Sequence, residues 1–144
     1  MTKIFISYSS QNLVLLEKLK TKFSTQRYFE LTIVPEQDMN LVPNSEKVIH
    51  ALDNANIFIC LLTNKARKNE WVNQEIGYWF GRKKGKMMYF LTEKSAMKHL
   101  KGFITSHLDQ PFRFSDELEF EDALEKLFLK LKQNHSLSGI YHVH

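Results

Sequence analysis

The chain has 144 residues, 43% of them hydrophobic and 25% charged, and carries a formal net charge of +4. This length and balance predict one globular domain with a sizeable core. No apolar run approaches the roughly 20 residues of a membrane span, so we expect no membrane association. The densest basic cluster, residues 82–86, is typical of a helix end and has no nucleic-acid-binding motif around it, so we expect no nucleic-acid partner.

The single cysteine, Cys60, lies inside an apolar strand pattern and is predicted to be a buried thiol. A lone cysteine cannot form an internal disulfide, which favours a reducing compartment. The N-terminus has no basic region followed by a hydrophobic stretch and a cleavage site, so we expect no secretory signal. These features predict a cytoplasmic protein.

Strands and helices are predicted to alternate along the chain. Short runs rich in β-branched and aromatic residues predict strands at residues 3–8, 31–34, 57–62, 87–91 and 110–114. Apolar residues at helical spacing predict a first helix marked by Leu13, Leu16, Leu19 and Phe23, then helices at 45–54 and 70–82. A last helix carries the stripe Phe120, Leu124, Leu127, Phe128 and Leu131. Residues 93–109 allow a short helix and a loop, and residues 133–144 show no clear pattern.

Five strands that alternate with helices predict an α/β fold with a parallel sheet covered by helices on both faces. The common flavodoxin-like order for five strands is 2-1-3-4-5, with its switch point between strands 1 and 3. Ligands of such sheets bind at the carboxyl ends of the strands, near the switch point. The loops at residues 8–11 and from 63 onward are therefore expected to line a crevice, with the loop at 35–44 close by.

Trp71 and Glu75 lie four residues apart in the helix predicted at 70–82, so their side chains share one face. They belong to a mixed stripe with Tyr78 and Arg82, whereas the stripe predicted to face the core holds Val72, Ile76, Trp79 and Phe80. A flat aromatic ring beside a carboxylate suits a ligand with a planar base and a sugar. The alternative is structural: Glu75 pairs with a nearby cation or a cap, and Trp71 covers the edge of the core.

Ser9 and Ser10 follow the first strand, where the start of a helix favours an anion. They can equally serve as helix N-caps, and both roles can hold together. The acidic residues of the loop at 35–44, Glu36 and Asp38, are most simply solvated.

Three other kinds of site are excluded. A phosphate-receiving regulator needs an acidic pair after strand 1, where this chain has Tyr8, Ser9 and Ser10. A P-loop needs a glycine-rich turn, and no glycine precedes Gly77. The six histidines show no zinc-binding spacing, so no metal site is expected.

Three segments at family spacing resemble TIR (Toll/interleukin-1 receptor) domains. The segment 4–10 (IFISYSS) resembles their first strand, 51–63 (ALDNANIFICLLT) their second helix and third strand, and 69–75 (NEWVNQE) their third helix. The resemblance implies a TIR domain over residues 1–133, followed by a tail at 134–144. The chain is similar in particular to bacterial stand-alone members such as the TIR subunit of Thoeris antiphage systems.

Many TIR domains are NAD⁺ glycohydrolases or cyclases, and the resemblance implies that this chain cleaves the nicotinamide–ribose bond of NAD⁺. The family's catalytic glutamate falls on Glu75, the aromatic after strand 1 on Tyr8 and the site tryptophan on Trp71. Ser9, Ser10 and Asp38 complete the expected substrate-binding residues, and NAD⁺ is a substrate rather than a cofactor. The product would be an ADP-ribose-type messenger that reaches a separate effector protein.

Two alternatives stay open: a non-catalytic TIR–TIR interaction module, and an enzyme like the nucleoside deoxyribosyltransferases. The loop at 35–44 lacks the glycine common in the family and the Arg-Asp…Pro-Gly pattern of receptor-type members. The resemblance also implies self-association, for which Met39 and Leu41 are candidate contacts unless they tuck under their own loop.

Overall fold

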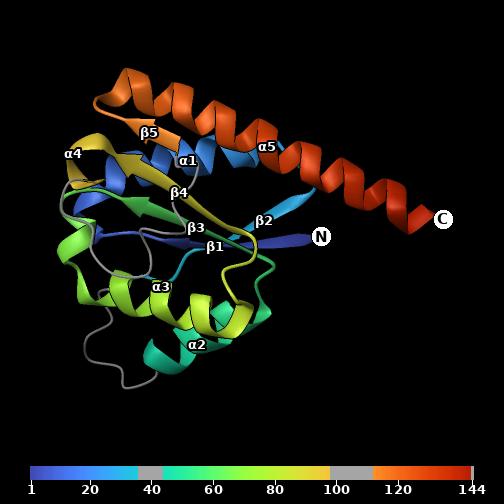
Figure 1. Ribbon diagram of the computed structural model, residues 1–144, viewed down its shortest axis with the longest axis horizontal. Coiled ribbons are helices and arrows are strands. Elements are labelled where there is room, and N and C mark those ends of the chain that lie inside the picture. The colour runs from blue at the N-terminus through green and yellow to red at the C-terminus, as the bar shows by residue number, and fades with distance from the viewer. Residues whose placement is uncertain (36–43, 98–111, 144) are drawn as a thin grey trace.

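The computed structural model describes residues 1–35, 44–97 and 112–143. One parallel sheet has the order β2-β1-β3-β4-β5, with helices on both faces (Figure 1), which confirms the predicted fold. The strands are β1 (Thr2–Ser7), β2 (Phe29–Thr32), β3 (Ile57–Leu62), β4 (Met88–Glu93) and β5 (Phe112–Phe114). The helices are α1 (Leu13–Ser24), α2 (Asn44–Asn54), α3 (Glu70–Lys83), α4 (Lys94–Met97) and α5 (Glu117–Val143), with 3₁₀ turns η1 (Ser10–Asn12) and η2 (Ala66–Lys68).

Alternating side chains of the central strands supply two separate cores. Ile4 and Ile6 of β1 pack with α1 and α5, whereas Phe5 of the same strand packs with α2 and α3. Every residue of β3 is buried, because this strand lies between β1 and β4 and is covered on both faces. Figure 1 shows α1 and α5 on one side of the sheet and α2 and α3 on the other.

The first strand lies one residue earlier than the predicted 3–8, and the starts of β2 and β4 differ from the prediction for local reasons. β2 begins at Phe29 rather than 31, because Thr2 of β1 pairs with Phe29 and that ring packs edge-on against Phe23, 5.7 Å between centroids. β4 begins at Met88 rather than 87, because Met87 has a φ of 51° and so leaves the extended conformation. Ile33 and Val34 lie outside the β2 ladder yet still pack against the cores.

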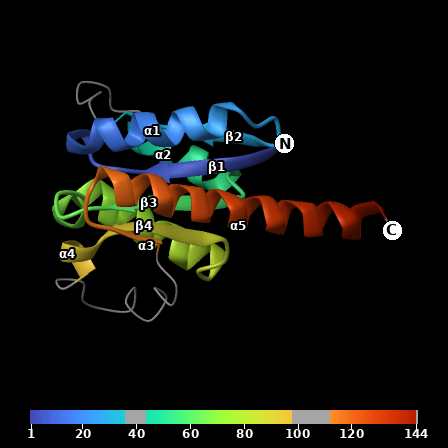
Figure 2. The same cartoon turned by 90° about the horizontal axis from the view of Figure 1, so that it is seen from above.

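Helix α5 is longer than predicted. Residues 133–144 show no clear sequence pattern, yet the helix continues to Val143. Leu131 is still buried and the Asn134 amide donates to the Tyr89 hydroxyl at 2.9 Å. Figures 1 and 2 show the turns after this point extending past the sheet. None of the helices that the structure describes has the length and apolar character needed to cross a membrane.

Candidate active site

A hollow opens at the carboxyl edge of the sheet, between the segments that follow β1 and β3. Its volume is about 460 Å³, and its lining residues are Ser9, Gln11, Asn64, Lys65, Lys68 and Asn69. We call it the rim hollow. β1 pairs with β2 on one side and with β3 on the other, so the chain changes direction across the sheet here. The rim hollow therefore lies at the switch point of the sheet. The segments after β1 and β3 therefore line one hollow, as predicted, whereas residues 36–43 of the third predicted loop lie outside the described residues.

Polar contacts hold the two loops around this hollow together. Thr63, at the end of β3, donates from its hydroxyl to Asn12 Oδ1 at 2.7 Å and accepts from the Ala66 amide at 3.0 Å. Asn69 caps α3 by accepting from the Val72 amide at 3.1 Å, as predicted. Because Thr63 and Asn69 fix both ends of η2, the start of α3 is held at the edge of the sheet.

Glu75 lies one turn into α3 beyond Trp71 and faces the end of β1. The Ser7 hydroxyl donates to Glu75 Oε1 at 2.7 Å, and both residues are buried. Ser7 is fully covered and Glu75 is 8% exposed. Burying a carboxylate is costly unless it is hydrogen-bonded, so the hydroxyl of Ser7 offsets part of the cost of placing Glu75 here.

Cys60 is directly beside this pair. It is the register partner of Ser7 across β1 and β3, and its thiol is fully covered. Burial raises the pKa of the Cys60 thiol, the negative charge of Glu75 raises it further, and the interaction with the Ser7 hydroxyl acts in the opposite direction. The thiol therefore stays protonated at neutral pH and is no nucleophile, which agrees with the prediction of a core cysteine.

Comparison with protein families matches residues 4–128 to the TIR domain. The chain belongs to the TIR domain family. A comparison with curated proteins finds no match. The match ends within α5, and members of this family can be NADases.

The mixed stripe on α3 of this TIR domain divides into two parts. Trp71 is half-buried and packs against the core on the α2–α3 face, at the same end of α3 as Glu75. At the other end, the Tyr78 hydroxyl donates to Asp53 Oδ1 at 2.8 Å, and Arg82 Nε lies 3.4 Å from the same oxygen. The hydrogen bond to Asp53 also raises the pKa of Tyr78. Tyr78 and Arg82 thus join α3 to α2, which leaves Trp71 and Glu75 as the part of the stripe near the rim.

The remaining predicted site residues lie in different places. Ser9 is 3% exposed, lines the rim hollow and accepts from the Gln11 amide at 3.2 Å, so its predicted capping role is confirmed for η1. Ser10 begins η1 and is half-buried. Tyr8 lies in the core shared with α1 and α5, its hydroxyl 3.5 Å from the Val34 carbonyl oxygen. Asp38 lies outside the described residues.

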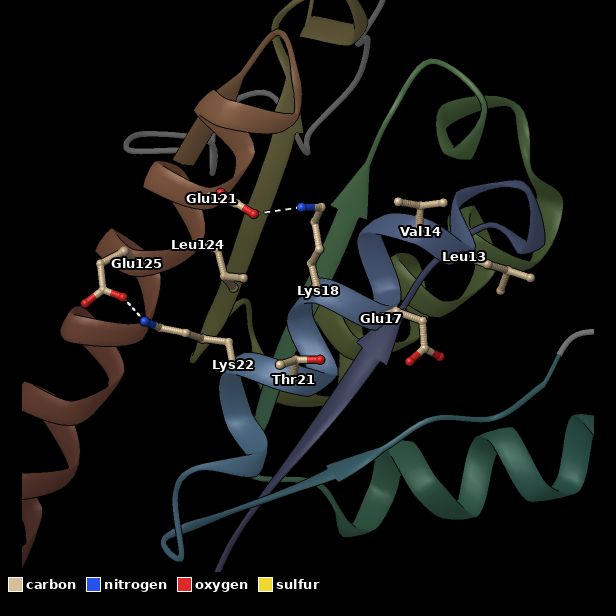
Figure 3. Close-up of a pocket in the computed structure, with 9 residues that line it drawn as sticks. All are labelled: Leu13, Val14, Glu17, Lys18, Thr21, Lys22, Glu121, Leu124 and Glu125. Atoms are coloured by element: carbon tan, nitrogen blue, oxygen red, sulfur yellow. Dashed lines mark hydrogen bonds and ion pairs between the residues drawn. The ribbon is translucent and has the colours of Figure 1, made fainter.

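A larger hollow, about 790 Å³, lies between α1 and α5, on the opposite face of the sheet from α3 and Glu75. Two ion pairs span it, Lys18–Glu121 at 2.7 Å and Lys22–Glu125 (Figure 3). Because the lysines and glutamates of this α1–α5 groove neutralise each other across a helix–helix contact, we place the site at the rim hollow instead. Among the described residues no cluster of His, Cys, Asp or Glu can hold a metal ion.

Sequence reasoning missed Ser7 and the lysines of η2. Ser7 interrupts an apolar strand at the position that alternates with Phe5, so strand periodicity alone could have placed its hydroxyl on the α2–α3 face. Lys65 and Lys68 follow the third strand and could have been assigned to the predicted crevice. That they share one hollow with Ser9 and Gln11 could not have been predicted without the loop geometry.

Proposed function

We propose that this TIR domain cleaves the nicotinamide–ribose bond of NAD⁺, with Glu75 as the catalytic residue. The observation that carries the proposal is the buried hydrogen bond from Ser7 to Glu75 at the carboxyl edge of the sheet. This bond holds one oxygen of the Glu75 carboxylate in place. Glu75 belongs to α3, the helix that starts at the rim hollow. Family membership supports the same chemistry, because TIR domains can be NADases.

The reaction needs a negative charge where Glu75 lies. The bond between ribose C1′ and the nicotinamide nitrogen breaks, its electron pair leaves with neutral nicotinamide, and positive charge develops on the ribose. A preorganised carboxylate stabilises that cation more than it stabilises the uncleaved sugar. Water then adds to C1′ and loses a proton, giving ADP-ribose, or a nitrogen of the adenine adds instead and gives a cyclic product.

Trp71 is the aromatic residue that we assign to stacking on the substrate. It is half-buried, so part of its ring is accessible, and it lies one helical turn before Glu75. We assign Ser9 and Ser10 to hydrogen bonding with the substrate at the rim. Tyr8 could stack on a base only if its ring left the core that it shares with α1 and α5.

Replacing Glu75 with Gln tests the proposal. The amide keeps an oxygen that can accept from Ser7 but removes the charge, so nicotinamide release should fall by on the order of 10² or more. Glu70→Gln is the matched control, since Glu70 is exposed in the first turn of the same helix, and it should keep wild-type activity.

Near wild-type NAD⁺ cleavage by a folded Glu75→Gln variant would refute the assignment. A wild-type protein that releases no nicotinamide would instead favour the non-catalytic interaction module. Base exchange between nucleosides, without loss of NAD⁺, would favour the deoxyribosyltransferase-like alternative.

We further propose that the product is a diffusible ADP-ribose-type messenger that activates a separate effector protein in antiphage defence. The proposal rests on the resemblance to Thoeris TIR subunits. A cytoplasmic location suits this role, because NAD⁺ is an intracellular metabolite and the buried free thiol of Cys60 needs no oxidising compartment.

We also propose that activity depends on self-association through the loop after β2. Its candidate contacts, Met39 and Leu41, lie outside the described residues. If neighbouring copies complete the site, nicotinamide release per molecule should rise with protein concentration. A constant specific activity over a wide dilution series, with a monomer seen throughout by light scattering, would contradict the idea.

A further inference from the structure

Two lysines of the rim hollow belong to the 3₁₀ turn η2 and its cap: Lys65 is the N-cap and Lys68 is the last residue. Lys65 and Lys68 are three residues apart, and the Lys68 amide donates to the Lys65 carbonyl at 3.3 Å. In 3₁₀ geometry, side chains three residues apart eclipse each other, so both ammonium groups extend from one face of the turn. Both lysines line the rim hollow.

The other residues of the turn hold that face in place. Ala66 is fully buried, and its amide donates to the Thr63 hydroxyl at 3.0 Å. Arg67 makes a different contact from the two lysines: its Nε donates to Asn64 Oδ1 at 3.4 Å. The turn is therefore anchored on its inner side, while Lys65 and Lys68 are both exposed.

Neither lysine is neutralised by an acid in the described part of the chain. The ion pairs found there involve Lys18, Lys20, Lys22, Arg82, Lys94 and Lys126. The described residues that line the rim hollow include no carboxylate, and Glu93 accepts from the backbone amide of one of them, Asn64, at 2.9 Å. Two adjacent ammonium groups repel each other, and a bound dianion would remove that repulsion.

Ser9, on the segment that follows β1, supplies a third donor. Its side chain is almost fully buried and lines the rim hollow. Within the described residues its hydroxyl only accepts, from the Gln11 amide, which leaves its own hydrogen to donate. A phosphate group, with acceptor oxygens and two or more charges, satisfies all three donors at once.

From these features we infer that Lys65 and Lys68, together with Ser9, bind the diphosphate of the dinucleotide substrate. This inference rests on the proposed function for the identity of the ligand. Asn69, the last lining residue in the sequence, caps α3, and Glu75 lies six residues further along, a rise of about 9 Å. The rim hollow and the proposed catalytic carboxylate are therefore neighbours along one helix.

Binding of ADP-ribose to the full chain by calorimetry tests the inference without any turnover. The double variant Lys65→Ala/Lys68→Ala should bind ADP-ribose about tenfold more weakly than wild type, whereas Lys65→Arg/Lys68→Arg should bind within a few-fold. Lys47→Ala/Lys130→Ala removes the same charge from exposed positions on α2 and α5 and should bind like wild type. Adenosine, which has no phosphate, should bind equally to all variants.

The inference is overturned if wild type does not bind ADP-ribose, if the alanine variant binds it like wild type, or if adenosine binding falls in parallel. ADP-ribose should also compete with NAD⁺, and the alanine variant should raise KM for NAD⁺ with kcat little changed. Binding that depends on the lysines without such competition would mean a separate phosphate-bearing ligand and would overturn the substrate assignment.

The two proposals fail in different ways. Lysine-dependent binding of ADP-ribose by a protein that never releases nicotinamide would refute the glycohydrolase and leave the phosphate site standing. NAD⁺ cleavage with an unchanged KM in the alanine variant would refute the phosphate site and leave the glycohydrolase standing.

Discussion

The sheet has two faces, and the same central strands contribute to both. On the α1–α5 face, β1 contributes Ile4 and Ile6 to an apolar core, β3 contributes Ile57, Ile59 and Leu61, and Tyr8 follows β1 into the same core. On the α2–α3 face, the alternation passes from Phe5 and Phe58 to Ser7 and Cys60, and Glu75 lies above them. Polar groups in a core cost stability, so a face that keeps them in one place, at the ligand-binding edge, is organised for more than packing.

The α1–α5 face gives the largest expected effect on stability. Leu127 is fully buried there, so Leu127→Ala should lower the free energy of unfolding by about 2–5 kcal/mol, measured by chemical denaturation. Leu129→Ala is the control on the same helix, since Leu129 is 46% exposed, and it should change stability little. If the two faces differ as we argue, NAD⁺ cleavage per folded molecule stays at the wild-type level in both variants.

Trp71 is expected to affect stability and activity together. Trp71→Ala should cost less stability than a fully buried aromatic, about 1–3 kcal/mol, because the ring only covers the edge of the core. It should also reduce NAD⁺ cleavage through loss of the stacking surface. Trp71→Phe keeps an aromatic face and should recover much of both. A Trp71→Ala variant that melts early but retains full activity per folded molecule would reduce the residue to a structural role.

Ser7 gives the smallest effect of the three and the sharpest contrast. Ser7→Ala should lower kcat about tenfold, near 1.4 kcal/mol, because Glu75 loses the donor that orients it. The melting temperature should fall by only a few degrees. Ser24→Ala, an exposed serine at the end of α1, should change neither.

Coupling distinguishes orientation from general damage. In the Glu75→Gln background, Ser7→Ala should cause little further loss, because the charge that Ser7 orients is already gone. Fully additive losses would mean that Ser7 does not act through Glu75.

The fold could be predicted because its signals are local and repeated. Six consecutive apolar residues in β3 and the capping residue Asn69 define their elements from the sequence alone. The start of β2 could not be placed, because the contact between Phe23 and Phe29 that fixes it is tertiary. The helical end of α5 was missed for a related reason: its sequence has no clear apolar stripe after Leu131 to mark it.

The candidate site was predictable only as far as helix periodicity and strand order reach. These place Glu75, Trp71 and the loop after β3 at one edge of the sheet. Periodicity could not separate Glu75 from Tyr78 and Arg82, because the partner that divides the stripe, Asp53, belongs to another helix. The partnership of Ser7 with Glu75 spans 68 residues and depends on how α3 lies across β1.

Because Cys60 is buried, chemical labelling of its thiol can report local opening of the protein. It is the only cysteine in the sequence, it is fully covered, and burial raises the pKa of its thiol, so an alkylating reagent can modify it only after the α2–α3 face opens. When opening is fast and reversible, the labelling rate gives the free energy of opening at the point where Ser7 and Glu75 meet. A ligand that binds at Glu75 should slow the labelling, so this one thiol also reports whether the candidate site is occupied.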